Sequence, residues 1–397
     1  MNNLMRQRRL FLQMGVSGVS LFAAGLLKPA ALAASNSGVF HSLADLGPLQ
    51  APDANGIMLP AGLKSRIVAR SGQAAASSSS YLWHSAPDGG ACFATEDGGW
   101  IYVSNCEGND GAGGVGALRF TANGSVADSY PILQNTSRNC AGGATPWGSW
   151  LSCEEFDRGQ VWECDPAGNS EAVLRPLLGT FEHEAAAVDL VHQCIYLTED
   201  DGEGGFYRFV AANGLPDLSA GRLEIAEVVS NGSDSSIRWH EVPDAGAELI
   251  PTRFQVEAST VFDGGEGIAV HDGKTYFVTK GDNRIWCYHN SSQKIEILYD
   301  AATHDDPILT GVDNVVITPA GDVLVAEDGG NMQIVALTPQ GQLFPLLQIV
   351  GHEDSEITGP AFDPSHQRLY FSSQRGAEGR SDSGVTYEIS AVQAGSR

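Results

Sequence analysis

The sequence has few basic residues and lacks several motifs that would identify an enzyme class at once. It holds 23 lysines and arginines against 48 aspartates and glutamates, a net charge of −25 at pH 7. Since no basic stripe or heptad pattern interrupts this acidity, we expect no nucleic-acid partner. The absence of a Gly-x-Ser-x-Gly elbow and of a complete Gly-x4-Gly-Lys-Ser/Thr loop argues against a serine hydrolase and a nucleotide-binding protein.

The cysteines have no Cys-x-x-Cys spacing, which argues against a structural zinc site of that kind. In an exported protein, seven cysteines favour disulfides, but an odd number leaves at least one without an intrachain partner. Two pairs are close enough in sequence to face each other across hairpins. These candidate disulfides are Cys92 with Cys106 and Cys153 with Cys164.

The first 33 residues have the pattern of a twin-arginine export signal. Arg8 and Arg9 precede an apolar run over residues 14–27, and Ala31-Leu32-Ala33 supplies small residues for cleavage. The run is shorter than the roughly 20 residues of a membrane-spanning helix, so we expect no stable membrane anchor. We expect the twin-arginine export machinery as a partner and a periplasmic or secreted location. This route carries folded proteins, which favours a metalloprotein.

The rest of the chain, residues 34–397, repeats a short unit. Few segments have helical periodicity, and the 47 glycines and short apolar runs are typical of an all-β protein. The first and last residues of each unit are fifteen positions apart, and each unit is predicted to be two strands around a turn. Successive units start 50, 44, 82, 47 and 46 residues apart. The six units are Gly90 to Asn105, Cys140 to Glu155, Glu184 to Glu199, Glu266 to Gly281, Asp313 to Asp328 and Gly359 to Gln374.

The six units predict a single six-bladed β-propeller domain, each unit being the inner hairpin of a blade. The long third interval predicts an insertion around residues 211–262, placed to cap the channel mouth. Residues 63–70 are expected to close the ring with residues 385–389. Because the two strands of a hairpin are antiparallel, both ends of every unit should converge on one mouth of the central channel.

The residues at these ends are mostly carboxylates, with one cysteine among them. Like charges held this close destabilise a fold unless a cation neutralises them. Oxygen clusters suit calcium or magnesium, whereas a thiolate calls for iron or zinc, so Cys140 is either diagnostic of a soft metal or a small packing residue. His183 and His271 are further candidate ligands, but we favour their interpretation as packing or surface residues. The predicted metal site consists of Asn105, Glu107, Cys140, Glu155, Glu184, Glu199, Glu266, Asp313 and Asp328.

Several segments between about Asp88 and Gly376 also share the pattern of a known family. They are Asn139-Cys140-Ala-Gly-Gly, Pro146-Trp-Gly-Ser-Trp-Leu-Ser-Cys-Glu-Glu155, His183-Glu184-Ala-Ala, Tyr196-Leu-Thr-Glu-Asp200, Glu266-Gly267, Asp313-Asn314 and Ser355-Glu-Ile-Thr-Gly-Pro360. They resemble the PhoX-type secreted alkaline phosphatases, most specifically between Cys140 and Glu155. The resemblance implies a six-bladed propeller, twin-arginine export, and iron and calcium ions that hydrolyse phosphomonoesters. By motif, Cys140, Glu184 and Glu266 match iron ligands, and Glu155, Glu199, Asp313 and Asp328 match the remaining metal-site motifs.

Two departures from the family pattern concern phosphate binding. Where the family has Arg-Pro before the glutamate matched by Glu266, this chain has Gly264-Gly265, and Asn-His-Glu of the first blade is Asn105-Cys106-Glu107. The arginine would clamp phosphate through paired hydrogen bonds. Gly264→Arg is therefore expected to lower the Michaelis constant, provided that the loop does not need a positive φ angle. The candidate substitutes for the clamp are Arg138, Lys280, Arg284 and Arg375.

We therefore expect an exported, monomeric, metal-dependent phosphoric ester hydrolase acting on a small-molecule phosphate ester, as a phosphomonoesterase or a phosphodiesterase. The predicted catalytic residues are Glu184, Glu266, Arg138 and Lys280. Two alternatives stay open. A calcium-dependent propeller lactonase needs one metal and no cysteine, and a metal-stabilised binding propeller needs no turnover at all.

Overall fold

A computed structural model describes residues 38–232 and 234–392 of the chain. All of the described residues belong to one compact unit, Ser37–Arg397. The predicted export signal lies outside the described residues. No helix within the described ranges is both long enough and apolar enough to cross a membrane.

The described residues form five hydrogen-bonded sheets. The first sheet consists of β3 (Pro87–Ala94), β4 (Trp100–Cys106), β5 (Gly113–Phe120) and β6 (Val126–Thr136). The second consists of β7 (Asn139–Ala144), β8 (Trp150–Glu154), β9 (Val161–Cys164) and β10 (Val173–Leu174). A third contains β11 (His183–Asp189), β12 (Cys194–Glu199), β13 (Phe206–Ala211), β14 (Gly221–Asn231), β15 (Asp234–Glu241), β16 (Gly265–His271), β17 (Lys274–Thr279), β18 (Arg284–His289) and β19 (Lys294–Asp300).

The last two sheets each include a strand from the beginning of the described chain. They are β1 (Ile57–Met58) with β20 (Val312–Ile317), β21 (Val323–Glu327), β22 (Gln333–Leu337) and β23 (Leu343–Ile349), and β2 (Leu63–Arg70) with β24 (Ile357–Phe362), β25 (Arg368–Ser373) and β26 (Val385–Ala391). Single-turn 3₁₀ helices are η1 (Pro176–Leu178), η2 (Thr252–Phe254), η3 (Ala301–Thr303), η4 (Gly376–Glu378) and η5 (Ser381–Ser383).

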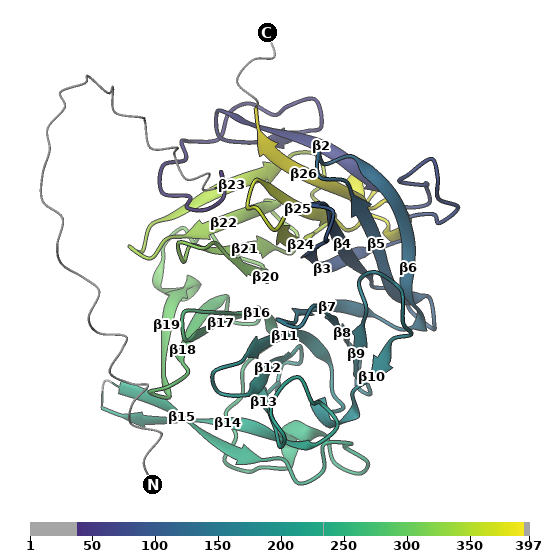
Figure 1. The fold of residues 1–397 in the computed structure, drawn as a ribbon. Coiled ribbons are helices and arrows are strands. Elements are labelled where there is room, and N and C mark those ends of the chain that lie inside the picture. Colours follow the sequence, from purple (N-terminus) through teal and green to yellow (C-terminus); the bar gives the residue numbers. More distant parts are fainter. Residues whose placement is uncertain (1–37, 233, 393–397) are drawn as a thin grey trace, which may run out of the picture. The chain divides into compact units, whose positions relative to one another are not determined.

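The sheets surround a common centre, which makes the fold all-β and propeller-like. The inner strands β3, β7, β11, β16, β20 and β24 lie nearest this centre in Figure 1. β2 pairs with β26 from Leu63 opposite Ala391 to Arg70 opposite Val385, so the predicted closure by residues 63–70 and the last strand is confirmed. An early strand and the last strand thus complete one sheet.

The prediction of six separate blades is only partly met, because one sheet has nine strands. β14 and β15 form a long hairpin from Glu224 opposite Glu241 to Asn231 opposite Asp234. One residue pair, Ser236 with Lys294, joins β15 to β19 and so connects β11–β15 to β16–β19. The predicted insertion therefore supplies this hairpin and a following excursion that contains η2.

All six predicted inner hairpins pair antiparallel, and each contains a β-bulge near the same end. The register shifts between Pro87 and Gly90, Asn139 and Gly142, His183 and Ala186, Gly265 and Ile268, Val312 and Val315, and Thr358 and Ala361. A bulge re-aims the side chains of the extra residues and is common beside active sites. The bulges therefore set which side chains of the six inner strands point towards the mouth.

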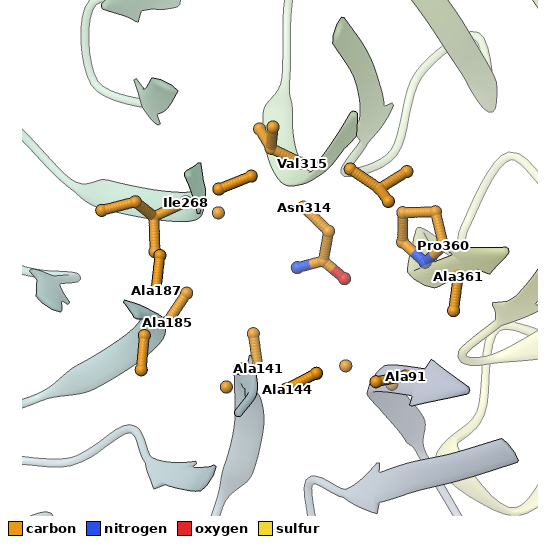
Figure 2. A pocket seen from close by; sticks show the side chains of 18 of the residues that line it. Ala91, Ala141, Ala144, Ala185, Ala187, Ile268, Asn314, Val315, Pro360 and Ala361 are labelled. Atoms are coloured by element: carbon orange, nitrogen blue, oxygen red, sulfur yellow. The ribbon is translucent and has the colours of Figure 1, made fainter. Parts of the chain in front are cut away.

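A cavity lined mainly by apolar residues lies between the inner strands, beside the bulges. A cavity of about 420 Å³ is lined by small residues of all six inner strands, including Ala141, Ala185 and Gly359. Figure 2 shows Ala91, Ala141, Ala185, Ala187 and Ala361 around this space, with the Asn314 amide directed into it. The Asn314 side chain donates to Asp313 Oδ1 at 2.7 Å and accepts from the Gly359 N–H at 2.6 Å. Asn314 thus connects the channel wall to a predicted metal ligand.

The two candidate disulfides are wrong, since all seven cysteines are free thiols. Cys92 lies opposite Tyr102, and Cys106 lies opposite Pro87 at the other end of the same hairpin. Cys153 lies opposite Val161, whereas Cys164 lies opposite Trp150. Proximity in sequence placed each pair on one hairpin, but the registers put the members of each pair at opposite ends of it.

Candidate metal centre at the channel mouth

A first ring of polar side chains comes from the bulged residues of the inner strands. We call it the strand-start ring, and its members are Asp88, Cys140, Glu184, Glu266 and Asp313. The exposed fractions of the Asp88, Glu184, Glu266 and Asp313 residues are 1%, 0%, 3% and 7%. The ring is therefore a buried set of acids rather than a solvated surface.

A second ring is set by a backbone hydrogen bond that recurs in every inner hairpin. The residue just after the second strand of the hairpin donates its N–H to the carbonyl of the residue just before the first strand. Glu155 donates to Arg138 in this way at 2.8 Å, and Lys280 donates to Gly264 at 2.8 Å. We call these donors the strand-end ring. They are Glu107, Glu155, Asp200, Lys280, Asp328 and Gln374.

The two rings converge into three groups of potential metal ligands. In each group, one ligand atom from every residue lies within 4.8 Å of the others. Two of the groups share Glu184, so one carboxylate lies between a sulfur-containing group and an all-oxygen group. The groups are Cys140, Glu155 and Glu184; Glu184, Glu266 and Asp313; and Asp88, Glu107 and Glu356. Six of the nine residues predicted to bind metal belong to these groups. A seventh, Asp328, belongs to the strand-end ring.

Glu184 carries the clearest indication that a cation belongs here. Its residue is 0% exposed, and neither carboxylate oxygen has a hydrogen-bond partner. Leaving a buried polar group unpaired costs roughly 1–3 kcal/mol, and an ionised one costs more. A cation between the carboxylates would remove this cost, and a thiol with several carboxylates is a donor set that fits iron and calcium.

The pKa values of the clustered groups are raised because burial and neighbouring carboxylates both disfavour the ionised form. Burial, followed by the charge of Glu107, raises the pKa of Glu155 to about 9. Burial, followed by the charge of Asp200, raises that of Glu266 to about 8. The pKa values of Glu184 and the Cys140 thiol are raised for the same reasons. Without a cation, the centre would therefore hold protons at neutral pH.

Three basic side chains contact this acidic centre. Arg138 lies 3.0 Å from Glu155 and 3.5 Å from Glu107. Lys280 Nζ lies 2.5 Å from Asp200 and 2.7 Å from Glu266, and Arg375 lies 2.7 Å from Glu356. Burial lowers the pKa of Lys280, but the charges of Glu266 and Asp200 raise it by a larger amount. The ammonium therefore stays charged. Arg284, the remaining candidate, pairs with Asp282 and Asp300 instead.

Lys280 occupies the space beside Gly264, where the family resemblance predicts an arginine. Gly264 has φ +67°, and a Cβ atom built on it would lie 2.8 Å from Lys280 Cγ. The condition attached to Gly264→Arg therefore fails, because the loop does need a positive φ angle at this residue. A side chain at residue 264 and the lysine at residue 280 compete for the same volume.

Asn105 and Glu199 lie close to the mouth, but protein groups already occupy their polar atoms. The Asn105 amide donates to the carbonyls of Cys140 and Ala141 and accepts from Trp150 Nε1 and Ser152 Oγ. Glu199 accepts from Tyr207 at 2.7 Å, from the Gly205 N–H at 2.8 Å and from Arg253 at 2.8 Å. Neither residue belongs to a ligand group found among the described residues.

Two members of the ligand groups were absent from the predicted set. Asp88 was missed because the first repeat was taken to begin at Gly90, although its bulge begins two residues earlier. Glu356 lies just before β24, and its backbone carbonyl accepts from Gln374. Aligning Asp88-Gly-Gly with Cys140-Ala-Gly would have found the first. Glu356 lay in a segment that had carried the family resemblance without being assigned a role.

His183 packs against an aromatic side chain, its Nδ1 has no hydrogen-bond partner, and its role as a packing residue remains a prediction. It is fully buried, its ring stacks on Phe181 with centroids 3.6 Å apart, and its Nε2 lies 3.1 Å from the Gly179 carbonyl oxygen. Burial lowers its pKa to about 3, so the ring is neutral. It therefore lies in the aromatic packing beneath the mouth rather than among the ligand groups.

The raised carboxyl pKa values predict how the stability of the metal-free protein depends on pH. The folded state keeps protons on Glu155 and Glu266 up to about pH 9 and 8, whereas the unfolded chain releases them near the ordinary value of 4.5. The folded state binds more protons in this window, so its free energy of unfolding falls as the pH rises. Thermal unfolding of chelator-treated protein should give its higher midpoint near pH 5 and a lower one near pH 9.

Two controls separate this effect from general acid or base sensitivity. Metal-loaded protein should lose less stability across the same window, because bound cations keep the carboxylates ionised. Glu155→Gln removes one of the titrating groups and should flatten the curve of the metal-free protein. A metal-free protein that is more stable at pH 9 than at pH 5 would contradict the prediction.

Comparisons with solved structures agree with the propeller-like fold. The chain has the fold of Pseudomonas fluorescens PhoX, solved in complex with vanadate, a transition state analogue, with a TM-score of 0.72 and 18% sequence identity over 87% of this chain and 97% of that one. A Bacteroides thetaiotaomicron protein of unknown function matches with a TM-score of 0.53 and 8% identity over 87% of this chain and 84% of that one. No curated protein matches the sequence.

A family model gives the more specific result. The model described as alkaline phosphatase PhoX matches residues 110–161 and 156–376, which is more than half of the chain. The matched range contains Cys140 and five of the clustered carboxylates, Glu155, Glu184, Glu266, Asp313 and Glu356, so the candidate metal centre lies largely within it. The resemblance seen in the sequence is thereby confirmed, and the chain belongs to the PhoX alkaline phosphatase family.

Proposed function

We propose that this chain is an exported phosphomonoesterase that uses a cluster of iron and calcium ions at the channel mouth. Family membership supports hydrolysis of phosphoric esters. The observation that carries the proposal is the Glu184 carboxylate, which two ligand groups share and which has no hydrogen-bond partner. Phosphodiesters are the alternative substrate class, because they present the same non-bridging oxygens to the site.

In this proposal, Cys140, Glu184 and Glu266 hold iron, and the neighbouring carboxylates hold calcium. The second set comprises Asp88, Glu107, Glu155, Asp313, Asp328 and Glu356. When bound, these ions would polarise the phosphoryl group and offset the negative charge of the transition state. Glu199 and Asn105 would act indirectly, Glu199 by holding Arg253 and Asn105 by holding the backbone at Cys140.

Arg138 and Lys280 are the proposed phosphate-binding cations. Each contacts ligand carboxylates on one side and is partly exposed, with side-chain exposures of 37% and 42%. A phosphate at the mouth could therefore take over their contacts without opening the fold. Guanidinium and ammonium groups held in this way bind phosphate oxygens and stabilise charge that develops on them.

Elemental analysis of natively exported protein, paired with turnover of p-nitrophenyl phosphate, tests this function. We expect iron together with calcium, phosphatase activity that chelation removes, and inhibition by vanadate, the analogue that the P. fluorescens relative binds. Calcium alone with hydrolysis of lactones would favour the lactonase alternative. Bound metal without hydrolysis of any ester or lactone would favour a binding propeller.

Export is a further part of the proposal, and it rests on Arg8, Arg9 and the Ala31-Leu32-Ala33 site. Replacing both arginines by lysine should leave unprocessed precursor in the cytoplasm, because the export machinery recognises the arginine pair. Cell fractionation with an antibody against the chain measures this. An unchanged periplasmic yield of processed protein would argue against the twin-arginine route.

We also propose that residues 34–397 form one monomeric six-bladed domain. Counting β11–β15 and β16–β19 as two blades is supported by the single residue pair between them and by the bulge, which occurs once in each of six hairpins. An experimental structure in which β15 and β19 share a continuous ladder would contradict this count. A dimer in size-exclusion chromatography with light scattering would contradict the monomer.

A further inference from the structure

A second group of potential metal ligands lies on β18 and β19, away from the channel mouth. Cys287 and His289 are two residues apart on β18, so they lie on the same face of the sheet, and Glu296 of β19 is opposite Cys287. At the mouth end of β18, Arg284 pairs with Thr279, the neighbour of Lys280. His289 pairs with Lys274 at the far end of the same strand. The group therefore belongs to the opposite face of the fold.

The three donor atoms converge closely. Cys287 Sγ and His289 Nε2 are 3.9 Å apart, and His289 Nε2 and Glu296 Oε1 are 2.8 Å apart. All three ligand atoms lie within 4.8 Å of one another. Tetrahedral zinc with bonds of about 2.0–2.3 Å places its donors about 3.5 Å apart. Small side-chain rotations would therefore bring this set to the geometry of a zinc site.

The contacts of the histidine distinguish a metal site from a catalytic thiol. In a Cys-His-acid relay, one ring nitrogen faces the thiol and the other faces the acid. Here the same nitrogen, Nε2, faces both Cys287 and Glu296. Three donors aimed at one point are what a cation requires.

A pocket adjoins this group and leaves room for a further ligand. It has a volume of about 300 Å³ and lies between the β17–β19 region and the β21–β22 region. Cys287 and Glu296 line it together with Tyr276, Lys274 and Thr338. A zinc ion with three protein ligands keeps one position for water or another ligand. The pocket would give that position access to small molecules.

We propose that Cys287, His289 and Glu296 form a second metal site, which binds a zinc-type divalent cation with one coordination position open to this pocket. A thiolate, an imidazole and a carboxylate are all established zinc ligands. The absence of Cys-x-x-Cys spacing does not exclude such a site, because strands present alternate residues and cross-strand partners on one face. The ion would link the side chains of β18 and β19.

Cobalt binding tests the site apart from phosphatase activity. Metal-free protein carrying Cys140→Ser, which lacks the thiol at the mouth, is titrated with Co²⁺ while the charge-transfer absorption of a cobalt–thiolate bond is recorded. We expect one such band, its loss on adding Cys287→Ser, and at least about tenfold weaker binding on adding Glu296→Gln. Cys164→Ser is the matched control, since this buried thiol of β9 belongs to none of the ligand groups in the described ranges.

Zinc should also raise the thermal midpoint of the Cys140→Ser protein, but not that of the Cys140→Ser/Cys287→Ser protein. The single variant Cys287→Ser should keep full phosphatase activity when iron and calcium are supplied, so failure of this site is distinguishable from failure of the mouth. A cobalt–thiolate band that survives Cys287→Ser unchanged would overturn the proposal. So would a Glu296→Gln variant that binds cobalt as tightly as its parent, because Glu296 is exposed and its replacement leaves the core intact.

Discussion

Cys140→Ser is expected to abolish most iron binding and to lower phosphomonoester turnover by at least about 100-fold. Even residues that only orient a metal ligand lower metal affinity or activity by about 10- to 100-fold when they are replaced. Cys140 supplies the one sulfur atom of the ligand groups at the mouth. Serine keeps a similar volume but offers a hard oxygen donor, which favours calcium over iron. Calcium should therefore be retained better than iron. Elemental analysis and p-nitrophenyl phosphate turnover measure both effects.

The matched control is Cys153→Ser, which alters a fully buried thiol of β8 outside every ligand group within the described ranges. It should cost stability without removing iron from the folded protein. Thermal unfolding in chelator separates the two effects, because loss of a ligand should matter little once the metal is gone. Full iron content and full activity in Cys140→Ser would mean that the thiol is a packing residue, and the proposed iron site would then be wrong.

Lys280→Met is expected to lower kcat/KM for a phosphomonoester by about 10²- to 10³-fold, the usual effect of removing one preorganised group that stabilises developing charge. The lysine ammonium contacts Glu266 and Asp200, and the lysine side chain lies beside Gly264. Methionine keeps most of the length of the side chain without its charge. Lys280→Arg should restore part of the activity, and both variants should keep their metals.

Lys294→Met is the control for loss of a positive charge, because that lysine is 58% exposed and 3.8 Å from its acidic partner. Its activity should match that of the unaltered protein. Unchanged kcat/KM in Lys280→Met would remove the lysine from the site and leave Arg138 as the phosphate-binding cation. Loss of metal from Lys280→Met would instead make the lysine a support for Glu266.

Because residues 264 and 280 share one space, paired substitutions at the two positions give a sharper test of phosphate binding. Gly264→Arg alone should be impaired, because a left-handed conformation costs an ordinary residue about 1–2 kcal/mol and the new Cβ would crowd Lys280. Arg138, which precedes Cys140 as Gly264 precedes Glu266, has φ 47°, so an arginine can adopt this backbone. Gly264→Arg with Lys280→Ala should therefore recover activity relative to Lys280→Ala. An equal loss in both would show that the family's arginine has no counterpart here.

Much of the mouth followed from the sequence because a β-propeller repeats its geometry. The constant fifteen-residue spacing identified all six inner hairpins, and antiparallel pairing then placed their ends at one rim. The differences between sequence and structure are shifts of one or two residues. Asp200, adjacent to the predicted Glu199, belongs to the strand-end ring, and the bulge of the first hairpin begins at Asp88, two residues before the predicted start at Gly90. Successive residues of a strand face opposite sides, so a shift of one residue reverses the side chain's direction.

The sequence by itself determined the inner hairpins, the rim that their ends share and the family, because these depend on spacing and residue type along the chain. Tertiary structure alone decided which carboxylates meet, since the bulges set the direction of each side chain and Glu184 lies between two groups only once the strands surround the channel. It also decided that Lys280 fills the space beside Gly264 and that no cysteines pair. Such contacts join residues distant in sequence, and no local pattern encodes their distances.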